Sequence, residues 1–356
     1  PLPFLEFADR NFNQWYLFDF SPDRTNYGLY FFKYNNFGRN QTLKLSLVTG
    51  YTDLLGLEYR IPYLPKAPKW GLELRSSYKR NHEIWLTSSD DKLRFLRHNN
   101  EDMVKRLNAS LKVVYRPNRH QDFLAFETGY RNVQVADTVV NSTIFPSYLE
   151  GNRNENDFWV NAMEISRERR NNKLFPTNGS YTFFRVEQWL MGGNHLNFTS
   201  LLHHSTHIPV WSKSNVGLAL SMYHTGLSNP PYLLLPALGY NRLVRGYENY
   251  VITGQSYSLV QSHFKHQLIK RRPQIKYMPL KGYRSVPLEV YASVHTDLGY
   301  VNNPQDDPQN HLQNGVLVGY GVGLDALFYM EKLIRMEYSF TKEGSGGLFV
   351  HFKKAF

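Results

Sequence analysis

Leu107-Asn-Ala-Ser-Leu-Lys-Val-Val-Tyr115 is the stretch of sequence that decides the fold. Its apolar and polar side chains alternate, and a period of two places each kind on one face of a β-strand. The polar face carries Lys112 and must therefore be wet. This pattern alone fits a soluble sheet with one exposed face as well as a strand between lipid and a water-filled lumen.

The length and spacing of the alternating segments distinguish a soluble sheet from a membrane barrel. The alternation recurs in segments of about 9–12 residues, the span of a tilted strand that crosses a bilayer, whereas strands of soluble sheets have about 5–6. It predicts strands near residues 27–35, 41–51, 53–61, 69–79, 83–97, 104–116, 121–133, 156–168, 180–191, 197–207, 215–224, 255–268, 287–297, 314–325, 329–341 and 347–356. We therefore predict an all-β fold, a transmembrane antiparallel β-barrel of about sixteen strands, an even number as in closed bacterial barrels.

The composition agrees with a barrel. The 356 residues include no cysteine, which excludes disulfides and thiolate metal sites. Aromatic residues make up 15% of the chain, yet the mean hydropathy is −0.48 and no apolar run approaches the ~18 residues of a membrane helix. The net charge of +11 is spread along the strands, which favours a basic lumen and loops that face anionic lipid or lipopolysaccharide, and argues against nucleic acid.

The chain is expected to form one domain after a short lead-in. Residues 1–24 alternate poorly and contain three prolines. We predict that they are a lead-in or linker rather than a barrel strand, and that residues 25–356 form the outer-membrane β-barrel domain.

A segment of about 30 residues, near 225–254, interrupts the alternation and carries Leu243-Val-Arg-Gly-Tyr247. Loops longer than about 12–15 residues are usually functional or disordered, and this one is too apolar to be disordered. It suggests a loop packed into an interior, with Arg245 aimed at a buried carboxylate and Gly246 allowing the bend. An ordinary surface loop with a solvated arginine is the alternative.

Little in the sequence indicates catalysis, a cofactor or a metal, and we predict none of them. His203 and His207 of an H-H-x-x-H pattern would lie ~13 Å apart on a strand, too far for one ion. Ser221 and His224 would point to opposite faces of the wall. The glycines of Tyr320-Gly-Val-Gly-Leu-Asp325 are better explained as strand glycines that let a barrel wall bend than as a nucleotide loop.

Four stretches carry a family resemblance. They are Val244-Arg245-Gly246-Tyr247, Thr296-Asp297-Leu298-Gly299, the turn Leu174-Phe175-Pro176-Thr177-Asn178-Gly179, and the final strand with Leu348, Val350, Phe352 and the terminal Phe356 on one face. In this order and spacing they resemble the barrel of the BamA-like outer-membrane assembly-factor superfamily, also called the bacterial surface antigen family. The similarity runs from about Ala8 to Phe356.

The resemblance implies that a sixth outer loop folds into the lumen and that Arg245 pairs with Asp297 of the D-x-G motif, near Gly299. Two positions depart from the family pattern. Lys265 stands where relatives often have a glutamate, so we expect one acidic partner for Arg245 rather than two. Gly344, Gly346 and Gly347 precede the last strand, whereas relatives often have a glycine kink within it.

The function implied by the resemblance is assembly and insertion of β-barrel proteins in the bacterial outer membrane, without enzymatic activity. A lateral seam would lie between the first strand, with Tyr30 and Phe32, and the last. The expected partners are unfolded outer-membrane clients, accessory periplasmic, lipoprotein or surface subunits, and outer-membrane lipid. Periplasmic POTRA domains, which family members carry ahead of the barrel, would precede residue 1 or be replaced by separate partners. The alternatives are a polypeptide secretion channel and a passive, anion-leaning pore.

Overall fold

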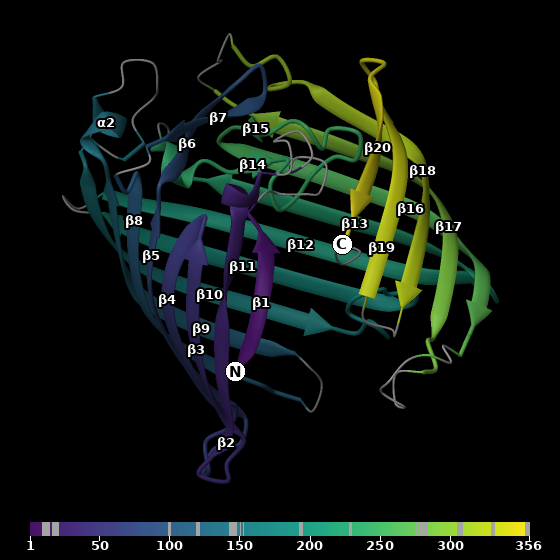
Figure 1. Cartoon of the computed structure of the whole chain (residues 1–356), viewed down its shortest axis with the longest axis horizontal. Helices are drawn as coiled ribbons and strands as arrows, with labels where there is room; N and C mark the ends of the chain where they lie inside the picture. Colours follow the sequence, from purple (N-terminus) through teal and green to yellow (C-terminus); the bar gives the residue numbers. More distant parts are fainter. Residues whose placement is uncertain are drawn as a thin grey trace.

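The computed structural model describes residues 1–8, 15, 21–98, 101–118, 122–141, 148–149, 151, 153–191, 195–227, 230–274, 277, 284–304, 309–328 and 332–352. Sixteen strands form one antiparallel sheet (Figure 1). They are β1 (Leu2–Phe7), β2 (Thr25–Asn36), β3 (Gln41–Gly50), β4 (Thr52–Ile61), β5 (Trp70–Asn81), β8 (Val104–Tyr115), β9 (Phe123–Val135), β10 (Glu155–Glu168), β11 (Gly179–Met191), β12 (His195–Trp211), β13 (Ser214–Thr225), β16 (Ser256–Arg271), β17 (Leu288–Asn302), β18 (Val316–Phe328), β19 (Lys332–Thr341) and β20 (Gly346–His351). The predicted all-β class and strand number are confirmed.

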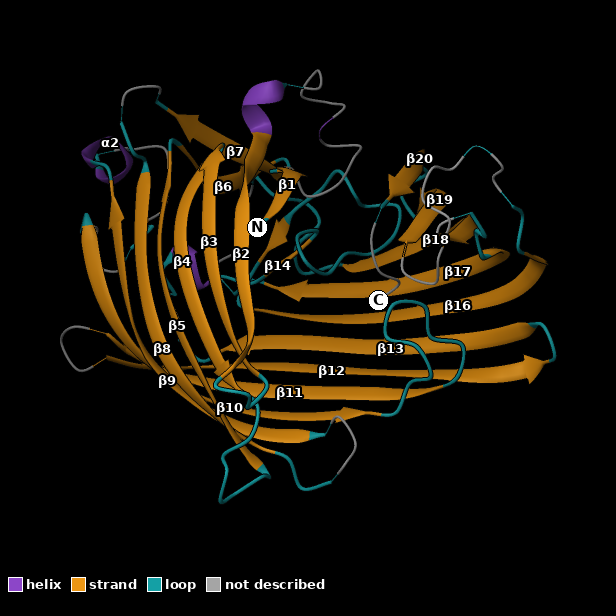
Figure 2. Ribbon diagram, turned by 60° about the horizontal axis from the view of Figure 1, so that its bottom comes forward, coloured by secondary structure: helices purple, strands orange, loops and turns teal. Residues whose placement is uncertain are grey.

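Each strand pairs with its neighbours in chain order, from β1 at one end of the sheet to β20 at the other. The sheet curls as it goes, so that β1 and β20 come to the same side of the molecule (Figures 1 and 2). The connection between β13 and β16, residues 226–255, is the sixth on its end of the sheet when β1–β2 is counted as the first. We call it loop 6. Among the described residues, no helix has the length and apolar character needed to cross a bilayer.

The two faces of the sheet have opposite character. On β17 the side chains of Tyr291, Ser293, His295, Asp297 and Val301 are buried. Those of the intervening positions are exposed and mostly apolar, with Val294 at 52% and Leu298 at 46%. Charged groups therefore face inward and apolar groups outward, which is the arrangement of a wall that separates lipid from a polar lumen.

Two strand predictions were wrong, and their errors cancel in the count. Residues 83–97 do not form a wall strand but a separate hairpin of β6 (Glu83–Ser89) and β7 (Lys92–Arg97). Its turn places Asp90 and Asp91 at φ 53° and 56°, as in the two-residue turn that suits a hairpin. The expected lead-in does contain a wall strand, because β1 pairs with β2 from Leu2↔Tyr30 to Phe7↔Thr25.

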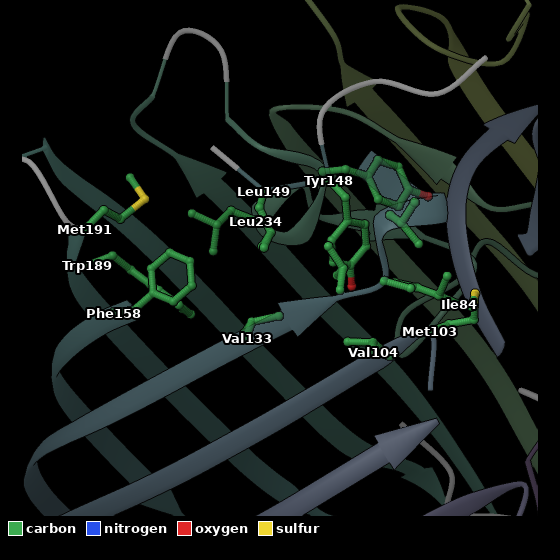
Figure 3. Close-up of a cluster of buried hydrophobic side chains, with 14 of the residues drawn as sticks. Ile84, Met103, Val104, Val133, Tyr148, Leu149, Phe158, Trp189, Met191 and Leu234 are labelled. Carbon is green, nitrogen blue, oxygen red and sulfur yellow. The ribbon is translucent and has the colours of Figure 1, made fainter. Parts of the chain in front are cut away.

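Loops pack inside the curled sheet at the end where loop 6 begins (Figure 3). Wall residues such as Val133, Phe158 and Trp189 contact Leu149 and, from loop 6, Leu234, and all five are buried. Smaller elements in the connections are the helix α2 (Asp137–Val140), the 3-10 helices η1 (Pro22–Arg24) and η3 (Tyr232–Leu234), and the strand pair β14 (Ala237–Leu238) and β15 (Ile252–Thr253).

The β6–β7 hairpin reaches across this end and fastens other loops. The backbone oxygen of Asp91 accepts a hydrogen bond from Val251 of loop 6 at 2.7 Å. The Asp91 carboxylate accepts one from the backbone N–H of His311 at 2.9 Å, in the connection between β17 and β18. Loop 6 is thus fastened by a hairpin that belongs to the connection between β5 and β8, on a different part of the wall.

Candidate functional site: the lumenal loop

Loop 6 turns back along the inner wall and buries its own apolar side chains there. Leu238, Val244 and Tyr247 of the loop pack with Leu259 and Leu317 of the wall, and each of the five is at most 2% exposed. Removing this apolar surface from water explains how a connection of such length stays ordered. The alternative of a surface loop with a solvated arginine is therefore wrong.

Arg245 lies at the tip of the loop and is 4% exposed. Its Nε donates to Oδ2 of Asp297 at 2.9 Å, and its Nη2 donates to Oδ1 of the same carboxylate. The backbone N–H of Arg245 also donates to Oδ2, at 3.0 Å, and Nη2 donates to the backbone oxygen of Ser262 at 2.9 Å. This is a two-pronged guanidinium–carboxylate contact, which depends on the planar fork of arginine. The structure brings together the two residues that the resemblance paired.

Arg245 has a second acidic neighbour, and the expectation of only one was wrong. Its Nη1 lies 3.5 Å from Oε1 of Glu337 on β19. Lys265 has a partner of its own, Asp325 on β18, at 3.0 Å, and Arg335 donates to the same carboxylate through Nε at 2.6 Å. Alternating positive and negative groups thus run along the inner wall from β16 to β19.

Burial by itself would lower the pKa of Arg245, but the carboxylates of Asp297 and Glu337 more than offset this and raise it. The guanidinium is therefore charged in any folded state that keeps loop 6 in place. Gln261 on β16 completes the surroundings, because its Nε2 donates to Oδ2 of Asp297 and to the backbone oxygen of Leu243, both at 3.2 Å.

Glycines of the wall make room for the loop tip. A Cβ on Gly299 would lie 2.4 Å from Cγ2 of Val244, and a Cβ on Gly319 would lie 1.8 Å from the backbone oxygen of Arg245. Gly246 itself has φ 98°, the left-handed region that favours glycine. The close approach of the loop thus explains why residue 299, in the D-x-G motif, and residue 319, on β18, are glycines.

Tyr247 and Glu248 extend the site toward the last strands. The Tyr247 hydroxyl donates to the carboxylate of Glu343, just after β19. Glu248 is 0% exposed, and its Oε2 accepts the backbone N–H of Gly246 at 2.7 Å. Burial, and next the nearby Glu337 carboxylate, raise the pKa of Glu248 to about 8.

The Leu174–Gly179 turn lies at the other end of the sheet and approaches the ion pairs of Lys265, Asp325 and Arg335 from there. Phe175 is 3% exposed and packs on Tyr291 with a ring-centroid distance of 4.7 Å, and Nζ of Lys265 lies 4.3 Å from the Phe175 ring centre. Gly179 has φ 97°, and a Cβ there would lie 2.1 Å from the backbone oxygen of Arg169. Thr177 is fixed by Asn171, which accepts its backbone N–H at 3.1 Å, while Pro176 precedes it. The motif therefore forms a turn whose phenylalanine enters the lumen.

The predicted seam residues are distributed differently from expectation. Tyr30 and Phe32 lie on β2, which is paired on both sides, and Tyr30 stacks on Phe4 of β1 at 4.2 Å. The terminal strands of the order are β1 and β20, so the strand at the first end of the sheet is β1 rather than β2. Leu348 and Val350 lie on β20, Phe352 follows it, and Phe356 lies outside the described residues.

Of the histidine and serine candidates, Ser221 contacts His203 rather than His224. His203 and His207 are both buried on the inner face of β12, and His203 Nδ1 lies 2.9 Å from Ser221 Oγ. His224 is exposed, on the other face of β13 from Ser221, so these two do not form a pair.

A charged cavity of about 440 Å³ lies along the inner face between β3 and β11. Its lining includes Lys44, Arg75 and Arg185 as well as the acids Glu58 and Glu127. Arg185 pairs with Glu127 at 3.0 Å, and Arg75 pairs with Glu73 at 2.6 Å. Acids accompany the bases throughout, so this part of the wall is not the uniformly basic lumen that the net charge suggested.

Comparisons with known proteins agree with this architecture. Residues 35–328 match the Omp85 superfamily domain, whereas no curated protein matches the sequence. BamA from Haemophilus ducreyi lacking POTRA domains 1–3 is 16% identical with a TM-score of 0.65, over 93% of this chain and 66% of that one. CdiB from Escherichia coli is 12% identical with a TM-score of 0.58, over 93% and 59%. CdiB from Acinetobacter baumannii is 11% identical with a TM-score of 0.54, over 92% and 55%.

At these identities the likeness to solved structures concerns the fold, and the chain spans less than two thirds of each of them. The superfamily domain covers most of the chain, from the end of β2 to the end of β18. This chain belongs to the Omp85 superfamily.

Proposed function

We propose that this protein inserts β-barrel proteins into the bacterial outer membrane as a non-enzymatic assembly factor. The observation that carries the proposal is the buried contact of loop 6, in which Arg245 joins Asp297 on β17 to Glu337 on β19. This contact braces β16 to β19, the part of the wall that leads to the last strand. A passive pore has no need of such an inner brace.

The terminal strands supply the second half of the argument. β1 and β20 are the two ends of the strand order, and within the described residues each is hydrogen-bonded to one neighbouring strand. A seam between these two strands is the place where the wall opens at least cost, because every other pair of neighbouring wall strands is joined by a ladder of backbone hydrogen bonds. A complete barrel has no free edge, and an insertase needs one.

In the proposed mechanism, a client strand adds to the opened edge by β-augmentation. Backbone hydrogen bonds to the edge replace those of the seam, and successive client hairpins follow until the client closes on itself in lipid. No nucleotide or other cofactor is required, because folding into lipid is downhill. The partners are unfolded outer-membrane proteins, lipid or lipopolysaccharide, and accessory periplasmic, lipoprotein or surface subunits, with a POTRA-like region ahead of residue 1 or on a separate chain.

A polypeptide secretion channel is the second candidate function, and a passive pore with a preference for anions is the third. The charged cavity between β3 and β11 favours both, because its lining of acids and bases offers a polar surface inside the wall. The fold similarity extends to CdiB as well as to BamA, so the fold does not separate the candidates.

Reconstitution into liposomes separates them. The purified protein is mixed with an unfolded outer-membrane client, and client folding is scored by heat-modifiable mobility while ion conductance is recorded. We expect client folding to be faster than on protein-free liposomes, with small or intermittent conductance. Large steady conductance without faster client folding would contradict the proposal and favour a pore.

A disulfide across the seam is expected to abolish client folding, because the edge then cannot open. The chain has no cysteine of its own, so Val350→Cys can be combined with single cysteines along Leu2–Phe7 until a cross-link forms. Client folding should fall to the protein-free rate and return on reduction. The matched control is Leu29→Cys with Leu47→Cys, register partners on the interior pair β2–β3. Full activity of the oxidised seam variant would rule out opening at this place.

A further inference from the structure

Three side chains with metal-binding atoms meet where loop 6 touches the last strands. Glu248 comes from the loop, Glu337 from β19 and His351 from β20, and one ligand atom from each lies within 4.8 Å of the other two. His351 Nε2 is 3.6 Å from Oε2 of Glu337 and 3.9 Å from Oε1 of Glu248. The three are far apart in sequence, so no spacing motif marks them.

The cluster is buried and its polar atoms are poorly satisfied. Glu248 and Glu337 are 0% and 1% exposed. Among the described residues, Oε1 of Glu248 and Nε2 of His351 are buried and have no hydrogen-bond partner. Burying a polar atom without a hydrogen-bond partner costs free energy, because the atom loses its hydrogen bonds to water. The other oxygen of Glu248 is held by the Gly246 N–H, which directs the unmatched one toward His351.

The surrounding charges leave one side of Glu337 open to a cation. Arg245 Nη1 and Arg335 Nε approach its Oε1, at 3.5 and 3.8 Å. The closest contact of His351 is with Oε2 instead. The guanidiniums therefore approach one oxygen of the Glu337 carboxylate, and the imidazole of His351 approaches the other.

We propose that Glu248, Glu337 and His351 form a binding site for a Zn²⁺-like divalent transition-metal ion, which ties loop 6 to the last two strands. Two carboxylates and an imidazole, with a water as the fourth ligand, match the preferences of such ions and not those of Mg²⁺ or Ca²⁺, which favour six or more oxygens. Ligand atoms at about 2.1 Å from a tetrahedral ion are about 3.4 Å apart. The two separations from His351, 3.6 and 3.9 Å, need to contract by only a few tenths of an ångström, and the two carboxylates, which lie within 4.8 Å of each other, by up to about 1.4 Å.

Metal binding can be measured directly on the untagged, detergent-solubilised protein. Zn²⁺ is titrated calorimetrically, and Co²⁺ is used as a spectroscopic probe of coordination number. We expect one ion per chain with a four- or five-coordinate Co²⁺ spectrum. Glu248→Gln and His351→Gln should each weaken binding by at least about tenfold, the loss typical even of residues that only support a ligand. His204→Gln is the matched control, because His204 is exposed and contacts Thr182 on the outer face.

A second readout guards against misfolded variants and does not depend on assembly activity. Hydrogen exchange of the backbone around Gly246 should slow when Zn²⁺ is added to the wild type and should not respond in folded Glu248→Gln. Absence of Zn²⁺ binding by the wild type, or binding that is unchanged in both ligand variants, would overturn the proposal.

Discussion

Arg245→Ala is expected to release the tip of loop 6 from the wall. The substitution leaves the buried carboxylate of Asp297 without its cation and removes the contact with Glu337. Removing one partner of a buried ion pair costs about 3–5 kcal/mol, which corresponds to about two to four orders of magnitude in the population of the docked loop. Assembly activity should fall with it, whereas the protein itself should still insert into membranes, because the apolar outer face is unchanged.

Hydrogen exchange of residues 243–248 and client folding in liposomes measure the two effects. Arg245→Lys should be intermediate, because a lysine keeps the charge but not the two-pronged contact. Arg242→Ala is the matched control, since Arg242 lies in the same loop and makes no ion pair within the described residues. Wild-type exchange and activity in Arg245→Ala would show that the contact does not hold the loop.

Gly319→Ala is also expected to displace the tip of loop 6 from the wall, but through a steric clash on the wall side of the contact. The new Cβ would lie 1.8 Å from the backbone oxygen of Arg245, and a backbone atom cannot move aside as the end of a flexible side chain can. Overpacking costs about 1–3 kcal/mol where the surroundings adjust, so exchange at Gly246 and Tyr247 should rise by about 5- to 150-fold.

The control is Gly315→Ala, immediately before β18, where the nearest atom to an added Cβ is 3.8 Å away. It should leave exchange unchanged. The effect of Gly319→Ala should also be small in an Arg245→Ala background, because the loop has then already left the wall. Additive effects in the double variant would mean that Gly319 acts through strand stability instead.

The alternation of the strands was enough to predict the fold class, because a lipid-facing wall imposes a period of two on every strand. The two strand errors have physical causes. Residues 83–97 together have the length of a wall strand, but Ile84-Trp85-Leu86 breaks the period of two and the Asp90–Asp91 pair at their centre indicates a hairpin. β1 contains Pro3, which cannot donate to a ladder and is tolerated at the end of a sheet.

The site was less predictable. The pairing of Arg245 with Asp297 came from a family resemblance, since nothing local to either residue identifies its partner. Glu337, Glu248 and Asp325 were missed because their positions relative to the loop depend on the register of four strands and on the path of loop 6 through the lumen. Lys265 shows the same limit, because its actual partner, Asp325, lies two strands away.

The most direct test of the account is a disulfide between the loop and the wall, Val244→Cys with Gly299→Cys, formed in the outer membrane of intact cells. A Cβ on Gly299 lies 2.4 Å from a Val244 methyl group, within reach of a bond that needs Cβ atoms about 3.5–4.5 Å apart. The control pair is Val244→Cys with Val294→Cys, since Val294 is 52% exposed on the outer face. Docking of loop 6 inside the lumen predicts an efficient disulfide in the first pair and none in the second. No disulfide in the first pair, with both cysteines open to a bulky water-soluble maleimide, would contradict it.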